Sequence, residues 1–283
     1  MALKLNNIFF ILITSLVSLS SFSQESDGPK PPKVTDYKSD SSYNDYSSLR
    51  FKVAKAQINK LKNGGALLVR LKTNANTISK LKAAGNIDIA TQVERETHLT
   101  NKIIVASYLQ EFTFCPVYFF YSNSSDSVKN QKLNGIFIDT NLVVDPTIVC
   151  NANFYLIAES DKVYNSSLGI VPESKASQAI ERGTPSREAP IVVKNRYFIQ
   201  LHKPFPFFQI QQSNAVPIVA APNGVYINLS ALHTQVKKEM NKKEAKRLIK
   251  FKNCVRGLSI SLDNFYTKNV GYEIPANLSE YVY

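Results

Sequence analysis

Two runs, Gly64-Gly-Ala-Leu-Leu-Val-Arg-Leu71 and Phe112-Thr-Phe-Cys-Pro-Val-Tyr-Phe-Phe-Tyr121, decide the fold of this 283-residue chain. Both are short, apolar and rich in branched or aromatic side chains, as buried strands are. The residues between them contain no proline and place apolar side chains at helical intervals. A helical connection of that length crosses a sheet and starts a parallel neighbour. We therefore expect two parallel, adjacent strands, at 65–71 and from Cys115-Pro116 to Tyr121.

Helices are expected before and after the first strand in the sequence. The pattern turns helical at Leu49 and stops at Asn63-Gly64, which tolerate the left-handed conformation that ends helices. A short helix follows Thr73 and breaks at Gly85. A longer one starts at about Ile87, with a buried stripe of Val93, Leu99, Ile103, Ala106 and Leu109. The fold class is therefore α/β, with a mixed central sheet flanked by helices.

Three later segments add to the sheet. Gly135–Ile138 and Phe154–Ala158 have the composition of short strands, and 190–201 has that of a hairpin that turns at Lys194-Asn-Arg196, with Asn195 at positive φ. The next residues, 203–208, hold two prolines and three phenylalanines. We expect this segment to be a loop packed on the core, because large exposed apolar patches are uncommon on monomers.

The first residues have the pattern of a cleaved export signal. Lys4 supplies a positively charged start, and residues 8–19 are an apolar run. Ser21-Phe-Ser23 then offers small residues at the positions that signal peptidase recognises. The run is shorter than the roughly 20 apolar residues of a membrane-spanning helix. We predict a signal peptide at 1–23, and a periplasmic or extracellular protein without a transmembrane helix in its mature chain.

Composition then divides the mature chain. Residues 24–48 are rich in proline, serine and charge, which predicts a flexible linker. The remainder, 49–283, is expected to form a single α/β domain. A composition that is 44% hydrophobic and 11% aromatic is sufficient for a buried core.

The net charge of +12 is concentrated in the segment 231–256. Leu232, Val236, Met240, Leu248, Phe251 and Val255 recur at helical spacing there, which predicts a C-terminal basic helix that ends at Gly257. Leu258–Leu262 would then supply an edge strand. The candidate contact residues are Lys237, Lys238, Lys242, Lys243, Lys246, Arg247 and Lys250.

This basic helix has three interpretations. Its lysines can be the solvated face of an amphipathic helix, or they can meet an acidic partner such as a membrane leaflet, lipopolysaccharide phosphates or an acidic protein. Nucleic acid is the least favoured partner, because the compartment is wrong and interleaved aromatic residues are nearly absent. The oligomeric state does not follow from the sequence.

Motifs for catalysis and cofactors are missing. There is no Cys-x-x-Cys, no His-Glu-x-x-His, no nucleophile elbow and no phosphate loop, so no metal or cofactor is expected. Cys115, Cys150 and Cys254 allow at most one internal disulfide, and their spacing does not select the pair. The carboxylates Glu159 and Asp161 are expected to be solvated, as most carboxylates are.

The order of the expected elements resembles the thioredoxin-like fold, in which a proline precedes the final hairpin, here Pro190. That fold would place a cysteine pair after the first core strand, where this chain has Lys72-Thr-Asn-Ala-Asn76. Without the thiols, disulfide exchange by the usual mechanism is not expected.

Four stretches carry a second resemblance. They are Ser21-Phe-Ser-Gln24, Gly65-Ala-Leu-Leu-Val-Arg-Leu-Lys-Thr73, Phe112-Thr-Phe-Cys-Pro-Val-Tyr-Phe-Phe120 and Gln200-Leu-His-Lys-Pro-Phe-Pro-Phe207. In these the chain resembles an uncharacterised family of exported proteins from Bacteroidota. The resemblance implies export and transfers no activity.

Two functional hypotheses follow. The first is a non-catalytic binding or accessory protein of the periplasm or cell envelope, which contacts an acidic envelope component or protein partner through the basic helix. The alternative is a thiol-dependent or hydrolytic enzyme whose site lies at the strand ends near Cys115 and the polar loop Ser122–Ser127. In open parallel sheets, ligands bind at the carboxyl ends of the strands, where this loop is expected.

Overall fold

Strand β1 (Gly65–Leu71) lies between two parallel neighbours in a computed structural model that describes residues 43–163, 187–201, 203–209 and 242–273. For residues 43–49, 187, 242 and 243 it describes the backbone alone. Strand β2 (Val117–Tyr121) pairs with β1 in parallel, and Leu67 faces Val117 in the register. The predicted adjacent, parallel pair is therefore confirmed.

Three more strands complete a five-stranded mixed sheet with the order β2-β1-β3-β4-β5. Strand β3 (Phe154–Val163) is parallel to β1 on the side opposite β2. Strands β4 (Arg187–Lys194) and β5 (Phe208–Gln209) follow in antiparallel pairing. Both neighbours of β1 run parallel to it, which is why its sequence is an almost uninterrupted apolar run.

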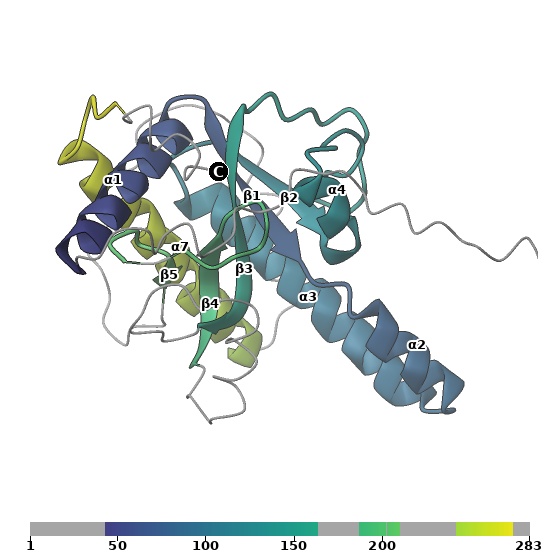
Figure 1. Cartoon of the computed structure of the whole chain (residues 1–283). Coiled ribbons are helices and arrows are strands. Elements are labelled where there is room, and N and C mark those ends of the chain that lie inside the picture. Colours follow the sequence, from purple (N-terminus) through teal and green to yellow (C-terminus); the bar gives the residue numbers. More distant parts are fainter. Residues whose placement is uncertain (1–42, 164–186, 202, 210–241, 274–283) are drawn as a thin grey trace, which may run out of the picture. The chain divides into compact units, whose positions relative to one another are not determined.

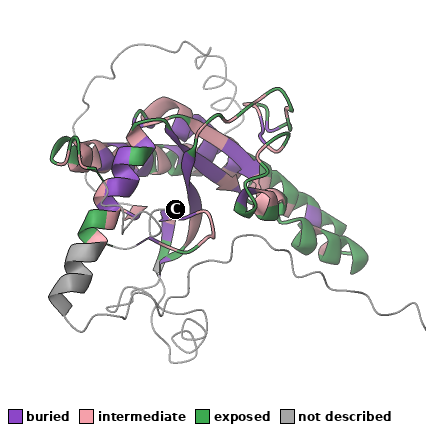
Figure 2. Ribbon diagram, turned by 45° about the horizontal axis from the view of Figure 1, so that its top comes forward, coloured by how far each residue is buried: buried purple, intermediate pink, exposed green. Residues whose placement is uncertain are grey.

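The connection between β1 and β2 is helical, as expected. It consists of α2 (Ala75–Ala83) and α3 (Ile87–Glu111), with Gly85 between them at φ +78°. Apart from Ala90, the buried side chains of α3 lie between Asn101 and Tyr108, and α2 has none. Figure 2 shows α2 and the first turns of α3 as largely exposed, so the second half of α3 provides most of the anchoring of the crossover.

Helices α1 (Tyr43–Lys62), α3 and α7 (Lys242–Thr267) cover one face of the sheet (Figure 1). Helix α1 begins earlier than the expected Leu49, so residues 43–48, assigned to the linker, are helical. The signal peptide and residues 24–42 lie outside the described residues. Ile58 of α1, Tyr108 of α3 and Val255 of α7 share one large apolar cluster, the first core.

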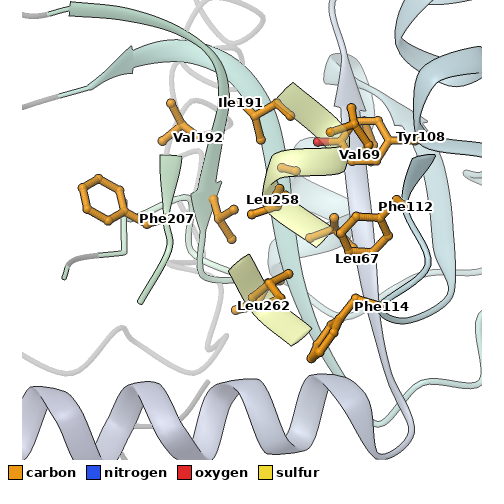
Figure 3. Packing of buried hydrophobic residues seen from close by; sticks show 14 of the residues in the cluster. Leu67, Val69, Tyr108, Phe112, Phe114, Ile191, Val192, Phe207, Leu258 and Leu262 are labelled. Atoms are coloured by element: carbon orange, nitrogen blue, oxygen red, sulfur yellow. The ribbon is translucent and has the colours of Figure 1, made fainter. Parts of the chain in front are cut away.

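Helix α7 corrects two expectations. Gly257 lies inside the helix instead of ending it, and Leu258–Leu262 is helical instead of an edge strand. The reason is packing: Val255, Leu258 and Leu262 continue the apolar stripe and are almost fully buried in the first core. Figure 3 shows Leu258 and Leu262 in this core. Gly257 lies where β5 approaches, and a side chain there would meet Gln209 Oε1 at 3.0 Å.

The opposite face of the sheet carries a smaller second core. Ala66 and Leu68 of β1 meet Phe120 of β2, and Val128 and Phe137 cover them. Val128 lies in the short helix α4 (Ser125–Lys129), which follows the 3-10 turn η2 (Ser122–Ser124). The expected strand at 135–138 is present as isolated bridges, from Phe120 to Phe137 and from Ile138 to Val144.

The hairpin after β4 is confirmed with a different turn geometry. Lys194 and Gln200 form an antiparallel bridge, and the residue at positive φ is Phe198 at 64°, instead of Asn195. Pro190 lies within β4 itself. The Pro- and Phe-rich loop packs on the core as predicted, because Phe205 and Phe207 are buried.

Candidate functional site

The structure describes the side chains of only three of the seven candidate contact residues. Lys237 and Lys238 lie outside the described residues, and the side chains of Lys242 and Lys243, in the first turn of α7, are not described. Lys246, Arg247 and Lys250 are exposed. We call these three the basic surface of α7.

The basic surface of α7 is held in place by the opposite side of the same helix. Leu248 is buried against Ile103 of α3, and Arg256 forms an ion pair with Glu111 at 2.8 Å. At the surface itself, Arg247 Nη2 donates a hydrogen bond to Thr100 Oγ1 at 3.3 Å. Among the described residues, no carboxylate lies within ion-pair distance of Lys246, Arg247 or Lys250. Their charge is therefore not neutralised by the described part of the fold.

A second charged group lies where β1 and β3 approach their carboxyl ends. Arg70 Nη1 contacts Glu159 Oε2 at 2.5 Å, and Lys194 Nζ contacts Glu159 Oε1 at 2.6 Å. Lys194 also forms an ion pair with Asp161. These four residues are the strand-end cluster. The Glu159 side chain is only 3% exposed, so the expectation that it is solvated was wrong.

The register of the sheet explains why the strand-end cluster forms. Val69 of β1 faces Ala158 of β3, so the next residue of each strand, Arg70 and Glu159, points to the opposite face, the side of the second core. Lys194 of β4 faces Ile157. A single arginine in an apolar strand was the available signal, but its partner is 89 residues away in the sequence.

Ion pairing governs the titration of this cluster. Burial raises the pKa of the Asp161 carboxyl, but hydrogen bonds from Lys194 Nζ and the Lys162 amide, with the charges of Lys194 and Lys72, outweigh burial and lower it. Burial lowers the pKa of Lys194, and the charge of Glu159 with hydrogen bonds to Asp161 and Glu159 reverses this, so that its pKa is raised. Both groups are thus charged at neutral pH.

The polar loop Ser122–Ser127 forms η2 and most of α4, next to the cluster. Ser125 Oγ accepts a hydrogen bond from Arg70 Nε at 2.9 Å and donates one to Ser122 O at 2.6 Å. Ser122 Oγ lies 3.4 Å from Thr73 Oγ1, at the end of β1. These contacts tie Ser122 and Ser125 to β1 and support the position of Arg70.

Cys115 and Ser122–Ser127 do not form one site. Cys115 precedes β2 and the serines follow it, so the two lie at opposite ends of this strand. Burial raises the pKa of the Cys115 thiol to about 12, despite the opposing charge of Lys62. A thiol with that pKa is protonated at neutral pH and is a poor nucleophile.

The remaining candidates bring no catalytic set together. Cys115, Cys150 and Cys254 are free thiols, and Cys150 packs on the second core while the other two belong to the first. Of the histidines, His98 is exposed and His202 and His233 lie outside the described residues. Within the described ranges, no three His, Cys, Asp or Glu side chains are placed to hold a metal ion.

Comparison of the chain with protein-family models, with curated proteins and with solved structures finds no match. In the described ranges, none of the helices combines the length and the apolar character that a bilayer crossing requires.

Proposed function

We propose that this is an exported, non-catalytic binding protein of the periplasm or cell envelope, and that the basic surface of α7 is its contact surface. The carrying observation is that Lys246, Arg247 and Lys250 are exposed and lack described carboxylate partners, on a helix whose other side is fixed in the first core. Fixed cations on a rigid helix attract an acidic surface without first having to be ordered.

The expected partner is an acidic surface, such as anionic lipid headgroups, lipopolysaccharide phosphates or an acidic protein. Ile249 lies among the three cations and is 59% exposed. An apolar side chain within a basic patch adds contact area once charge has brought the partner close. Lys237, Lys238, Lys242 and Lys243 precede this patch in the sequence and add to the positive charge of the same segment.

The test is charge reversal with a matched control. The triple variant Lys246→Glu, Arg247→Glu, Lys250→Glu should associate less with isolated envelope fractions in co-sedimentation. The control variant Lys52→Glu, Lys80→Glu, Arg95→Glu makes the same change in charge at exposed positions on α1, α2 and α3, and should associate almost as well as the unaltered protein. Equal losses in the two variants would reduce the effect to net charge and contradict a specific surface.

Export is tested separately. The mature protein recovered from the producing cell is expected to begin at Gln24, because Ser21-Phe-Ser23 offers the cleavage site. Mass spectrometry of the N-terminal peptide measures this directly. A chain that retains residues 1–23 in the cytoplasmic fraction would contradict export and would point to an intracellular partner for the basic surface of α7.

A further inference from the structure

The turn at Asn195–Phe198, after β4, is a strained segment on the side of the second core. Phe198 has φ 64°, in the left-handed region that bulky side chains rarely adopt. The turn is fixed by Asn195, whose Oδ1 accepts hydrogen bonds from the amides of Tyr197 and Ile199, each at 3.0 Å. Such backbone conformations are energetically costly and tend to cluster at functional sites.

Several cations converge on this turn. The Arg70 guanidinium lies 5.2 Å from the centre of the Phe198 ring, and Lys129 Nζ lies 5.6 Å from it. Arg196 is part of the turn, and its charge acts on Tyr155, whose hydroxyl donates a hydrogen bond to Val128 O at 2.6 Å. The turn, the carboxyl end of β1 and the end of α4 therefore share one cationic region.

The carboxylates of this region do not balance it. Glu159 is already shared by Arg70 and Lys194, and Asp161 is bound by Lys194. Asp126 lies 4.0 Å from Lys129 but is 92% exposed, so water screens this pair. Arg196 has no carboxylate partner in the described part of the chain, and the region keeps a positive excess.

Arg196 also has an unused donor. Its Nη2 donates a hydrogen bond to Tyr197 Oη at 2.6 Å, but its Nε is buried and has no acceptor among the described residues. A buried donor without an acceptor destabilises the fold, so such donors are rare unless something else satisfies them. The fold therefore leaves one buried guanidinium donor of Arg196 unsatisfied.

We propose that the Asn195–Phe198 turn, with Arg70 and Lys129, binds a small oxyanion: a phosphate, sulfate or carboxylate group. Arg196 supplies the buried donor, Arg70 and Lys129 supply charge, and Phe198 holds these two cations beside the turn. A planar guanidinium matches the paired oxygens of such groups. The site is distinct from the basic surface of α7 and lies on the face of the sheet that carries the second core, on which Phe198 packs.

The test uses the mature protein and inorganic phosphate at constant ionic strength. The arginine Nε–Hε signals are followed by NMR, with chloride as the reference salt. We expect a saturable shift of the Arg196 signal and a rise in the thermal midpoint. Arg196→Gln should weaken phosphate binding by roughly tenfold or more, as loss of a charge-assisted hydrogen bond does, while Arg95→Gln, at an exposed site on α3, should not.

The outcomes distinguish an oxyanion site at the turn from a bound water, from the basic surface of α7 and from a lipid site. Arg196→Lys keeps the charge and should still weaken binding, since it removes the Nε donor; circular dichroism checks that each variant folds. If phosphate causes no saturable shift of the Arg196 signal, or if chloride causes the same shift, the proposal is overturned. A bound water would then be the acceptor for Nε. Loss of phosphate binding in the α7 triple variant but not in Arg196→Gln would also overturn it. Arg196-dependent binding of anionic vesicles without binding of free phosphate would assign the oxyanion to a lipid headgroup.

Discussion

The two groups of charged residues in this protein are built in opposite ways. On the basic surface of α7, Lys246, Arg247 and Lys250 are exposed and have no carboxylate partner among the described residues. In the strand-end cluster, Arg70 and Lys194 share a carboxylate, Glu159, that is almost completely buried. Charge in the first group is available to a partner, whereas charge in the second is used within the fold.

This difference indicates what each group can do. Exposed cations contribute little to folding, since water screens them, and act on distant acidic surfaces in a salt-dependent way. A buried pair is strongly coupled, because losing one partner leaves an uncompensated charge. Mutations should therefore change binding at α7 and stability at the strand ends.

The largest expected effect concerns Cys115, a partly buried residue that belongs to neither group. Cys115 has a pKa raised to about 12 by burial. Iodoacetamide near neutral pH should label it about a thousandfold more slowly in the folded protein than in the urea-unfolded chain, because the thiolate fraction falls by about that factor. Mass spectrometry of quenched samples measures both rates. Equal rates would show that burial does not suppress ionisation here and would favour the thiol enzyme.

The next effect sharpens the contrast between buried and exposed pairs. Glu159→Gln should lower the free energy of unfolding by about 3–5 kcal/mol, since Arg70 and Lys194 lose their shared carboxylate. The matched control is Glu94→Gln, because Glu94 pairs with Lys82 at 2.6 Å in an exposed bridge. That loss should stay below about 1 kcal/mol. Urea unfolding measures both, and equal losses would contradict the distinction.

A smaller effect is expected in the pH dependence of stability. Because the folded pKa of Asp161 is lowered, its contribution is complete above the unfolded value of about 3.9 and is lost as pH falls through the folded pKa. Lys194 has a raised pKa, so its contribution is lost only as pH rises above about 10.4. Urea unfolding at a series of pH values should show a shallower acid limb for Asp161→Asn. Parallel acid limbs would contradict the pairing.

Much of the fold could be predicted because its signals are local. The apolar run of β1 and the aromatic run of β2 identified both strands, and helical spacing between them implied the parallel crossover. The expectation at Gly257 failed because a helix tolerates a glycine when packing rewards it. Here Leu258 and Leu262 are buried and Gln209 comes close.

The two charged sites differ in how far the sequence predicts them. The exposed cations of α7 are neighbours in sequence, so composition alone found them. The strand-end cluster joins residues from β1, β3 and β4, and it depends on a register that only the folded sheet defines. Likewise, the position of Phe198 beside Arg70 and Lys129 follows from the turn geometry, which placed the left-handed residue three positions after Asn195.

The smallest effect on stability is expected at α7. The triple variant Lys246→Glu, Arg247→Glu, Lys250→Glu should change the free energy of unfolding by only a few tenths of a kcal/mol per site, as surface substitutions usually do. Urea unfolding measures this. A loss as large as that of Glu159→Gln would mean that these cations support the fold, and would remove the reason to regard them as a contact surface.

The most direct test of the account is the salt dependence of binding. Association of the unaltered protein with envelope fractions should fall steeply as sodium chloride rises from about 0.05 to 0.5 M, since the Debye length shrinks over that range. The triple variant should bind weakly throughout and show little dependence on salt. Association of the unaltered protein that stays constant across these concentrations would contradict the claim that the basic surface of α7 makes the contact.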